Sequence, residues 1–178
     1  PKYPDTFWSF RHALKFVSKK ATDPPLGLLT VAAMLPEKWE KKLIDMNVMA
    51  LKDRDLKDVD LVFVSGMSIQ KASAEEVIYK CKKLGIKVVA GGPLFTTQYN
   101  LFDNVDYFVL NEAEITLPLF LEDFRNGTPK HIYQSNEFAD IENTPKPLWG
   151  LINKKKYVSL DIQYSRGCPF NCDFCDVT

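Results

Sequence analysis

The sequence predicts an α/β fold in which a doubly wound parallel sheet is covered by helices on both faces. Short apolar runs of strand length alternate with helical segments, which is the pattern of parallel strands joined by crossover helices. Residues 60–66 contain a continuous apolar run, as expected of a strand that is buried on both faces. The next segment, residues 73–84, has its apolar residues at helical spacing.

The individual elements follow in order along the chain. Residues 1–25 are rich in proline and aromatic residues, which predicts a loop with a short amphipathic helix over residues 10–17. Ser73 is expected to cap its helix through a capping box with Glu76, and Gly85 is expected to end that helix. The same reasoning predicts helices over residues 26–34 and 115–124, a helical turn over residues 53–59, and strands over residues 41–46, 60–66, 86–90 and 105–110.

The opening strand of such a sheet is not visible in the sequence. Residues 1–4 have the character of the loop that would follow it. We therefore expect the first strand upstream of Pro1 or missing from this numbering. Since the chain begins without methionine and ends soon after its last cysteine, we expect it to be a fragment of a longer protein.

The C-terminal part of the chain has a different character. Pro129, Pro145 and Pro147 interrupt residues 128–157, which predicts a linker. Residues 158–164 alternate with period two, which predicts a strand that opens a second domain. The expected division is an α/β domain over residues 1–127, a linker over residues 128–157 and the start of a truncated second domain over residues 158–178.

The amino-acid composition argues against two classes of binding partner. Lysine and arginine together equal aspartate and glutamate at 23 each, which argues against a nucleic-acid surface and a polybasic membrane anchor. The longest apolar stretch, residues 26–35, is far shorter than the ~20 residues that span a bilayer, and no signal peptide is visible. We expect a cytoplasmic protein without a membrane span.

Three cysteines near the end of the chain form the pattern C-x3-C-x2-C, at Cys168, Cys172 and Cys175. Thiolates ligate iron–sulfur clusters, and three of them leave one iron of a 4Fe–4S cube open to a small molecule. Two other interpretations of these cysteines remain open. A structural zinc would need a fourth ligand, for which Cys81, His12 and His131 are all far away in sequence. A disulfide is the other alternative, although nothing else suggests secretion.

This cysteine pattern resembles the signature of the radical SAM enzymes, with Phe174 in the aromatic position. The lead-in at residues 164–170 resembles the branch that carries an N-terminal cobalamin-binding domain. The resemblance implies a 4Fe–4S cluster held by Cys168, Cys172 and Cys175. It also implies S-adenosylmethionine bound at the open iron, an electron donor for the cluster and a 5′-deoxyadenosyl radical. The cysteine loop would follow the first strand of a radical SAM barrel, truncated here.

The loops after the predicted strands form a second candidate site. Ligands of open α/β sheets bind beyond the carboxyl ends of the strands, where glycines let a backbone approach a ligand closely. No dinucleotide or phosphate-loop fingerprint is present. Ordinary turn and helix-cap chemistry is the alternative explanation. The candidate cofactor-binding residues are Asp45, Asn47, Ser65, Gly66, Gly91, Gly92, Pro93, Asn111 and Glu112.

These loops resemble the cobalamin-binding domain of B12-dependent radical SAM proteins, a Rossmann-like or flavodoxin-like fold. Residues 24–29 look like that family's entry to its first helix, and residues 91–93 and 111–114 look like its later loops. Some cobalamin domains carry D-x-H-x-x-G, whose histidine coordinates cobalt. Asn47 stands at that position here, so the resemblance implies cobalamin bound without a histidine from this motif.

The resemblance implies an enzyme in the full-length protein, a cobalamin-dependent radical SAM methyltransferase acting on an unactivated carbon. The fragment itself is expected to be inactive. A small-molecule or lipid-like substrate is expected, and no catalytic residue can be assigned. The alternative is a ligand-binding or sensor module with a structural zinc or iron–sulfur site and no radical chemistry. Cys81 falls on the core side of its helix, so an inert buried thiol is expected there.

Overall fold

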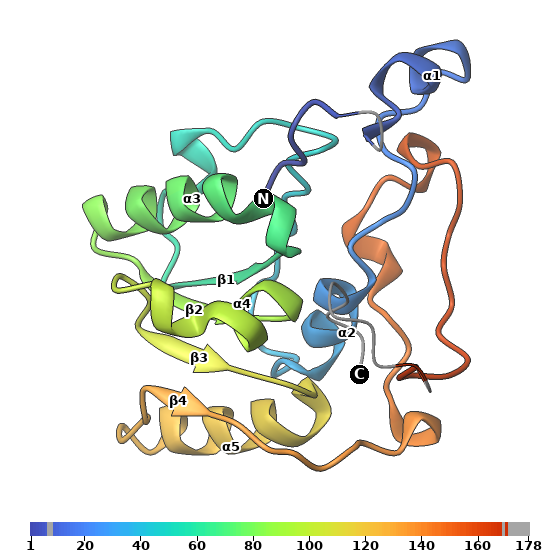
Figure 1. Cartoon of the computed structure of the whole chain (residues 1–178). Coiled ribbons are helices and arrows are strands. Elements are labelled where there is room, and N and C mark those ends of the chain that lie inside the picture. The colour runs from blue at the N-terminus through green and yellow to red at the C-terminus, as the bar shows by residue number, and fades with distance from the viewer. Residues whose placement is uncertain (7–8, 169, 171–178) are drawn as a thin grey trace.

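The computed structural model describes residues 1–6, 9–168 and 170, and its centre is a parallel sheet (Figure 1). The strands are β1 (Leu61–Ser65), β2 (Lys87–Gly91), β3 (Tyr107–Val109) and β4 (Ile132–Tyr133), hydrogen-bonded in the order β1–β2–β3–β4. All three pairings are parallel. The predicted α/β class is therefore confirmed.

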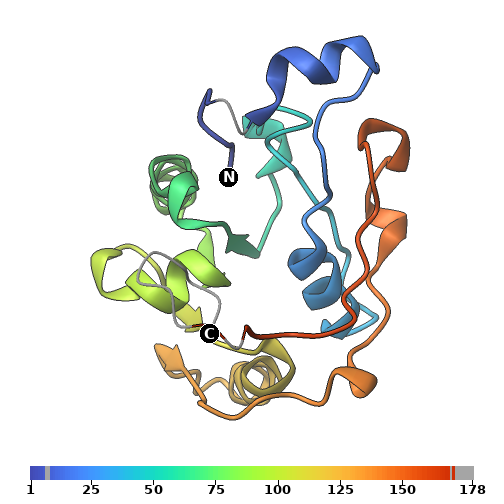
Figure 2. The same cartoon turned by 45° about the vertical axis from the view of Figure 1, so that its right-hand side comes forward.

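Helices cover both faces of the sheet (Figure 2). The helices α3 (Lys71–Lys83) and α4 (Pro93–Gln98) pack on one face, and α2 (Leu26–Met34) and α5 (Ala113–Arg125) on the other. The short α1 (Arg11–Phe16) lies at one end of the molecule (Figure 1). Short 3₁₀ turns complete the connections: η2 (Asp53–Asp55), η3 (Ser68–Gln70), η4 (Tyr99–Leu101), η5 (Ile141–Asn143), η6 (Trp149–Leu151) and η7 (Lys154–Lys156).

The apolar core is divided by the sheet into two clusters. Phe95 and Phe108 are fully buried in the cluster under α3 and α4, with ring centroids 6.3 Å apart. Phe120 occupies the centre of the cluster under α5 and contacts Tyr107 at 5.3 Å. Cys81 is completely buried, and burial raises the pKa of its thiol, as expected of an inert core cysteine.

The start of α3 differs from the prediction. The helix begins at Lys71, directly after η3, so the proposed capping box of Ser73 and Glu76 is wrong. Ser73 instead accepts a hydrogen bond at Oγ from the backbone N–H of Lys2 at 2.8 Å, because the N-terminal residues lie alongside this turn. The end of α3 is as predicted, since Gly85 follows it with a φ of 70°.

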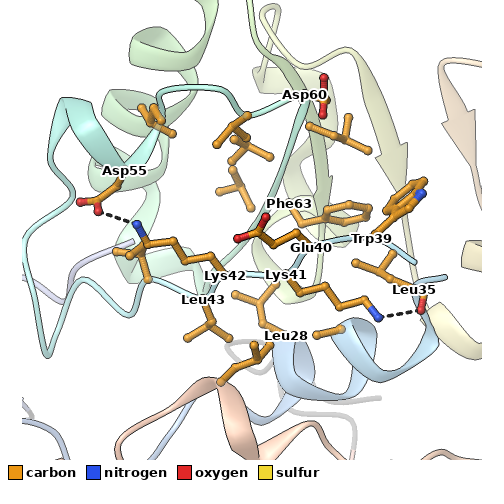
Figure 3. Close-up of a pocket in the computed structure, with 18 of the residues that line it drawn as sticks. Leu28, Leu35, Trp39, Glu40, Lys41, Lys42, Leu43, Asp55, Asp60 and Phe63 are labelled. Atoms are coloured by element: carbon orange, nitrogen blue, oxygen red, sulfur yellow. Dashed lines mark hydrogen bonds and ion pairs between the residues drawn. The ribbon is translucent and has the colours of Figure 1, made fainter. Parts of the chain in front are cut away.

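Two predicted strands do not form. Residues 41–45 form no regular element, Met46 begins a turn, and this segment pairs with none of the described strands, because β1 lies across a groove from it rather than beside it (Figure 3). Residues 158–164 are also irregular, so the described residues contain no barrel strand. Ile162 and Tyr164 are about nine-tenths exposed at 88% and 93%. Alternation alone does not make a strand, because a strand needs a hydrogen-bonding neighbour.

The part of the chain predicted as a linker contains β4 and then a segment that we call the C-terminal strap, residues 134–166. The strap runs along the α2 side of the molecule (Figure 2). Its Leu148 N–H donates to the carbonyl of Leu29 at 2.9 Å, and its Lys156 carbonyl accepts from Lys20 at 2.8 Å. An isolated parallel bridge joins Tyr157 to Ala21. Repeated backbone bonds therefore tie the strap to the α/β domain.

Within the described residues, no helix is long and apolar enough to cross a membrane.

Candidate functional site

The carboxyl ends of β1 and β2 meet closely. Gly92 has a φ of 84°, and a Cβ placed on it would collide with Ser65 Oγ. A Cβ on Gly91 would stand 2.5 Å from the carbonyl oxygen of Val109. Both glycines are thus required by neighbouring protein atoms and by the turn into α4.

The turn after β2 is locked to the loop after β1. The Leu94 N–H donates to the carbonyl of Gly66 at 3.0 Å. The Gly92 carbonyl accepts from the N–H of Phe95 at 3.1 Å, and Pro93 begins α4, where its missing N–H costs nothing. The structure therefore brings together Ser65, Gly66, Gly91, Gly92 and Pro93.

Asp45 and Asn47 form a compact turn with internal hydrogen bonds. Asp45 Oδ1 accepts from both the backbone N–H and the side-chain Nδ2 of Asn47 at 2.9 Å. Asp45 Oδ2 accepts from the hydroxyl of Tyr157 at 3.0 Å. Burial raises the pKa of Tyr157, and the charge of Asp45 raises it further, so the phenol stays protonated and donates. Sequence reasoning missed Tyr157, which lies in a segment predicted as linker.

The N-terminal residues join this turn to the loop after β1. The Tyr3 N–H donates to Asn47 Oδ1 at 2.8 Å, and Gln70 Nε2 donates to the carbonyl of Pro1 at 2.8 Å. Residues from two predicted loops are therefore connected through the beginning of the chain.

Asn111 occupies the loop after β3 in a left-handed conformation, with a φ of 60°. Its backbone N–H donates to Thr96 Oγ1 at 3.0 Å, which links this loop to α4. Its side-chain Oδ1 is buried and has no hydrogen-bond partner among the described residues. A buried acceptor without a donor is costly unless a ligand or water satisfies it.

Glu112 and Glu114, at the start of α5, hold Arg166 in the C-terminal strap. Arg166 Nη1 donates to Glu112 Oε2 at 2.9 Å, and Nη2 donates to Glu114 Oε1. Glu112 Oε2 also accepts from the N–H of Ala139 at 2.8 Å, and Thr144 Oγ1 donates to Glu114 at 3.0 Å. We call this group the Arg166 clamp (Glu112, Glu114, Thr144 and Arg166).

The pKa shifts of Glu114 and Arg166 agree with the hydrogen bond between them. Burial by itself would raise the pKa of Glu114, but its hydrogen bonds, led by that from Arg166, outweigh burial, so the pKa lies below its ordinary value. The hydrogen bond to Glu114 raises the pKa of Arg166. The carboxylate of Glu112 is thus already engaged within the protein, and its predicted contact with a cofactor stays a prediction. Glu114 belongs to the loop 111–114 that resembles the family, but it was not among the predicted cofactor-binding residues, although an acidic residue in a first helical turn is a recognisable signal.

The cysteine motif is only partly within the described residues. Cys168 is exposed and follows the clamp residue Arg166 by two positions, while Cys172 and Cys175 lie outside the described residues. The proposed metal ligands therefore stay a prediction. The described residues contain no cluster of His, Cys, Asp or Glu that could hold a metal ion.

The chain resembles known proteins over nearly its whole length. The family model of the B12 binding domain matches residues 18–121. An uncharacterized methyltransferase of Synechocystis sp. is 41% identical over 99% of the chain and 33% of its own length. The hopanoid C-2 methylase of Rhodopseudomonas palustris is 30% identical over 99% of the chain and 34% of its length. The bacteriochlorophyllide d C-8(2)-methyltransferase of Chlorobaculum tepidum is 28% identical over 84% of the chain and 34% of its length.

The chain thus spans about a third of the length of these curated relatives. No solved structure matches it. The matched region contains β1, β2 and β3 and the loops that follow them, which are the elements that carry the candidate cofactor-binding edge. The family resemblance drawn from the loop residues is confirmed, and the chain belongs to the B12 binding domain family.

Proposed function

We propose that this chain is the N-terminal part of a cobalamin-dependent radical SAM enzyme, a methyltransferase that acts on an unactivated carbon through a 5′-deoxyadenosyl radical. The observation that carries the proposal is the presence of a B12 binding domain and a C-x3-C-x2-C motif in one chain. Three relatives named as methylating enzymes, all far longer than this chain, support the reaction type.

The residues at the carboxyl edge fit a corrinoid. The buried, unpartnered Oδ1 of Asn111 would accept a hydrogen bond from a corrin amide, and Gly91 and Gly92 allow the neighbouring turn to pack tightly against Val109 and Ser65. Cobalamin, when bound, supplies a cobalt centre able to carry a methyl group. The remaining predicted residues, Asp45, Asn47, Ser65, Gly66, Pro93 and Glu112, shape the same edge.

Histidine ligation of cobalt is not part of the proposal. Asn47 replaces the histidine of the D-x-H-x-x-G pattern, and its amide is engaged by Asp45 and Tyr3. His131 immediately precedes β4, so it lies at the amino end of the sheet, opposite the candidate edge. The lower face of the corrin would therefore have no imidazole from these positions.

The Arg166 clamp attaches the chain just before the cysteine motif to the start of α5. Arg166 is held at the beginning of α5, which follows β3 on the candidate edge, and Cys168 is two residues further on. In the proposed enzyme, Cys168, Cys172 and Cys175 hold a 4Fe–4S cluster that binds S-adenosylmethionine at its open iron. Arg166 would thus be a positioning residue between the two cofactor sites.

The substrate class is a small or lipid-like molecule. One relative is named for hopanoids and another for bacteriochlorophyllide d. This chain alone offers no residue that chooses between such substrates. The selection would rest on the remainder of the full-length protein.

Hydroxocobalamin titration of the full-length protein tests the corrinoid site. Asn111→Gly keeps the left-handed backbone but removes the free acceptor, so affinity should fall by about tenfold with little loss of stability. Gly92→Ala should weaken binding further, because its Cβ displaces Ser65. Gly127→Ala is the control, since Gly127 has a φ of 77° but open space around it. Saturable binding that neither variant at the edge changes would refute the site.

Anaerobic reconstitution of the full-length protein with iron and sulfide tests the cluster. The wild type should turn brown, and added S-adenosylmethionine should change its electron paramagnetic resonance spectrum. Cys172→Ala should abolish the colour, whereas Cys81→Ala should retain it because Cys81 is buried in the core. A colourless protein holding stoichiometric zinc would favour a structural metal site instead.

A further inference from the structure

Positive and negative residues are equal in number in this chain, but they are not evenly mixed. Two segments that are far apart in sequence, residues 6–22 and 143–160, contain no aspartate or glutamate. Together the two segments contain seven lysines and one arginine. The neutral total therefore conceals two stretches of chain that carry positive charge only.

The fold brings these two segments together. The Lys20 N–H donates to the carbonyl of Lys156 at 2.8 Å, and the Val158 N–H donates to the carbonyl of Ala21 at 3.2 Å. Both views show α1, in blue, and η7, in orange-red, at the same end of the molecule (Figures 1 and 2). We call the lysines that α1, the loop after it and η7 contribute the lysine patch (Lys15, Lys19, Lys20, Lys154, Lys155 and Lys156).

The ammonium groups of the lysine patch are available to a partner. All of these lysines except Lys19 are exposed. Within the part of the chain that the structure describes, none of them forms an ion pair, whereas Lys42 and Lys80 elsewhere are paired with aspartates. Gathered like charges repel one another, and the chain itself does not neutralise them here. The lysine patch is therefore a surface that an anionic partner would stabilise.

Exposed apolar side chains lie within the same surface. Phe16 ends α1 and is 91% exposed, and Val17 after it is 55% exposed. Leu14 on the same helix is buried, so α1 is attached to the domain through Leu14 while Phe16 remains in solvent. Phe16 and Val17 directly follow Lys15 and precede Lys19 in the chain. Apolar side chains among lysines are typical of surfaces that lie in the interface of a bilayer.

We propose that this end of the molecule binds the surface of an anionic phospholipid bilayer. The lysine patch would lie against the lipid phosphates, and Phe16 and Val17 would insert among the headgroups. Lysine is a compact, strongly hydrated charge that needs no fixed geometry, which suits a fluid surface. Arginine, whose planar fork matches fixed carboxylates and phosphates, occurs once in the two segments.

The neutral total charge does not oppose this proposal. In salt of physiological strength a charge acts over only about 8 Å, so the charge that faces the bilayer decides the attraction. Each lysine near an anionic membrane strengthens binding by about fivefold. The proposal concerns attachment to a surface and not chemistry, so it does not depend on the proposed function.

Sedimentation of the full-length protein with lipid vesicles tests the lysine patch. The wild type should bind vesicles that contain phosphatidylglycerol, bind vesicles of phosphatidylcholine alone far more weakly, and be released by high salt. Lys154→Gln, Lys155→Gln and Lys156→Gln combined should weaken binding by about 100-fold, because three contributions of about fivefold are lost. These side chains are exposed, so the fold should be retained.

A second triple variant is the matched control for net charge. It combines Lys38→Gln, Lys57→Gln and Lys82→Gln, which are exposed and lie outside both segments. This variant has the same net charge as the first but keeps the lysine patch. Its binding should equal that of the wild type. An equal loss in the two triple variants would overturn the proposal, because net charge alone would then explain binding.

Phe16 tests the apolar part of the surface. Phe16→Ala should weaken vesicle binding by about tenfold, because most of an inserted ring is lost, whereas Phe16→Leu should retain most of the affinity. Phe138→Ala is the control, since Phe138 is 79% exposed but follows the acidic Glu137 in the strap. Equal effects of Phe16→Ala and Phe138→Ala would contradict insertion at α1.

The remaining outcomes separate the membrane from other partners. A full-length protein that does not bind anionic vesicles would overturn the proposal. Single-stranded DNA bound more tightly than vesicles, and lost in the variant of residues 154–156, would assign the patch to nucleic acid and also overturn it. A protein that binds vesicles but no hydroxocobalamin would support the membrane surface and refute the proposed function.

Discussion

The two halves of the sheet differ in how completely they are buried. β2 and β3 have neighbours on both edges, and Val88, Val89, Ala90 and Phe108 are almost wholly inaccessible. β1 is equally apolar in sequence, but only Val64 is buried. The difference teaches that burial of a strand depends on its neighbours as much as on its own residues. We call these regions the closed half (β2 and β3 with α4) and the open half (β1 with α2).

The largest expected effect is a contrast between two phenylalanines. Phe95→Ala in the closed half should lower the free energy of unfolding by about 3–5 kcal/mol, because it removes a fully buried ring. Phe63→Ala in the open half should cost about 1 kcal/mol, because Phe63 is only half-buried. Urea unfolding measures both. Equal losses of unfolding free energy in the two variants would contradict the difference between the two halves. A loss for Phe63→Ala that stays well below the loss for Phe95→Ala would sharpen it.

The Arg166 clamp at the edge of the closed half should contribute less. Glu114→Gln should lower the free energy of unfolding by about 1 kcal/mol near pH 7, after allowance for the partial exposure of both side chains. Because the folded-state pKa of Glu114 is depressed, the contribution is present above its ordinary pKa of 4.5 and is lost as pH falls below that value.

Unfolding curves of the wild type and Glu114→Gln between about pH 7 and pH 3 check this prediction. The difference between the two proteins should close on acidification. Glu122→Gln is the control, because Glu122 is exposed on the same helix and lies outside the clamp. A constant difference across this range would mean that the carboxylate charge has no part in the clamp.

Tyr157 in the C-terminal strap, which bonds Asp45, provides the corresponding test outside the closed half. Tyr157→Phe should cost about 0.5–1.5 kcal/mol, because Asp45 loses a buried hydrogen bond. The folded-state pKa of Tyr157 is raised, so its contribution is complete below the ordinary value of 10.0 and declines as pH rises towards the folded-state pKa. Stability measured at neutral and alkaline pH should therefore show the wild type losing its advantage above about pH 10. An unchanged advantage at high pH would contradict the assignment.

The smallest effect concerns the rim of the groove. Lys42→Met removes the ion pair between Lys42 and Asp55, in which the lysine side chain is 60% exposed. Exposed pairs contribute little and are screened by salt, so the urea midpoint should not move measurably at high ionic strength. A clear loss of stability there would show that Lys42 packs along the groove rather than simply closing its rim. Lys57→Met, at an exposed position near the same turn, is the matched control.

Much of the fold could be predicted because its signals are local. The apolar runs of β1 and β2, the spacing of α3 and the glycine that ends it are readable within a few residues. The candidate edge was predicted for the same reason, since Gly91 ends β2, Gly92 follows it and Asn111 lies two residues after β3. The strand predicted over residues 158–164 was wrong because the alternation of apolar residues is a local signal. Pairing with a partner strand depends on residues that are distant in sequence.

The sequence by itself determined the α/β class, the loops at the carboxyl edge and the spacing of Cys168, Cys172 and Cys175. Tertiary structure alone decided that Tyr157 bonds Asp45, 112 positions away, and that Arg166 bonds Glu112, 54 positions away. It also decided that β1 borders an open groove. The physical reason is that propensity and periodicity act over one or two turns of chain. Hydrogen bonds between distant residues, and the neighbours of a strand, exist only once the chain has folded.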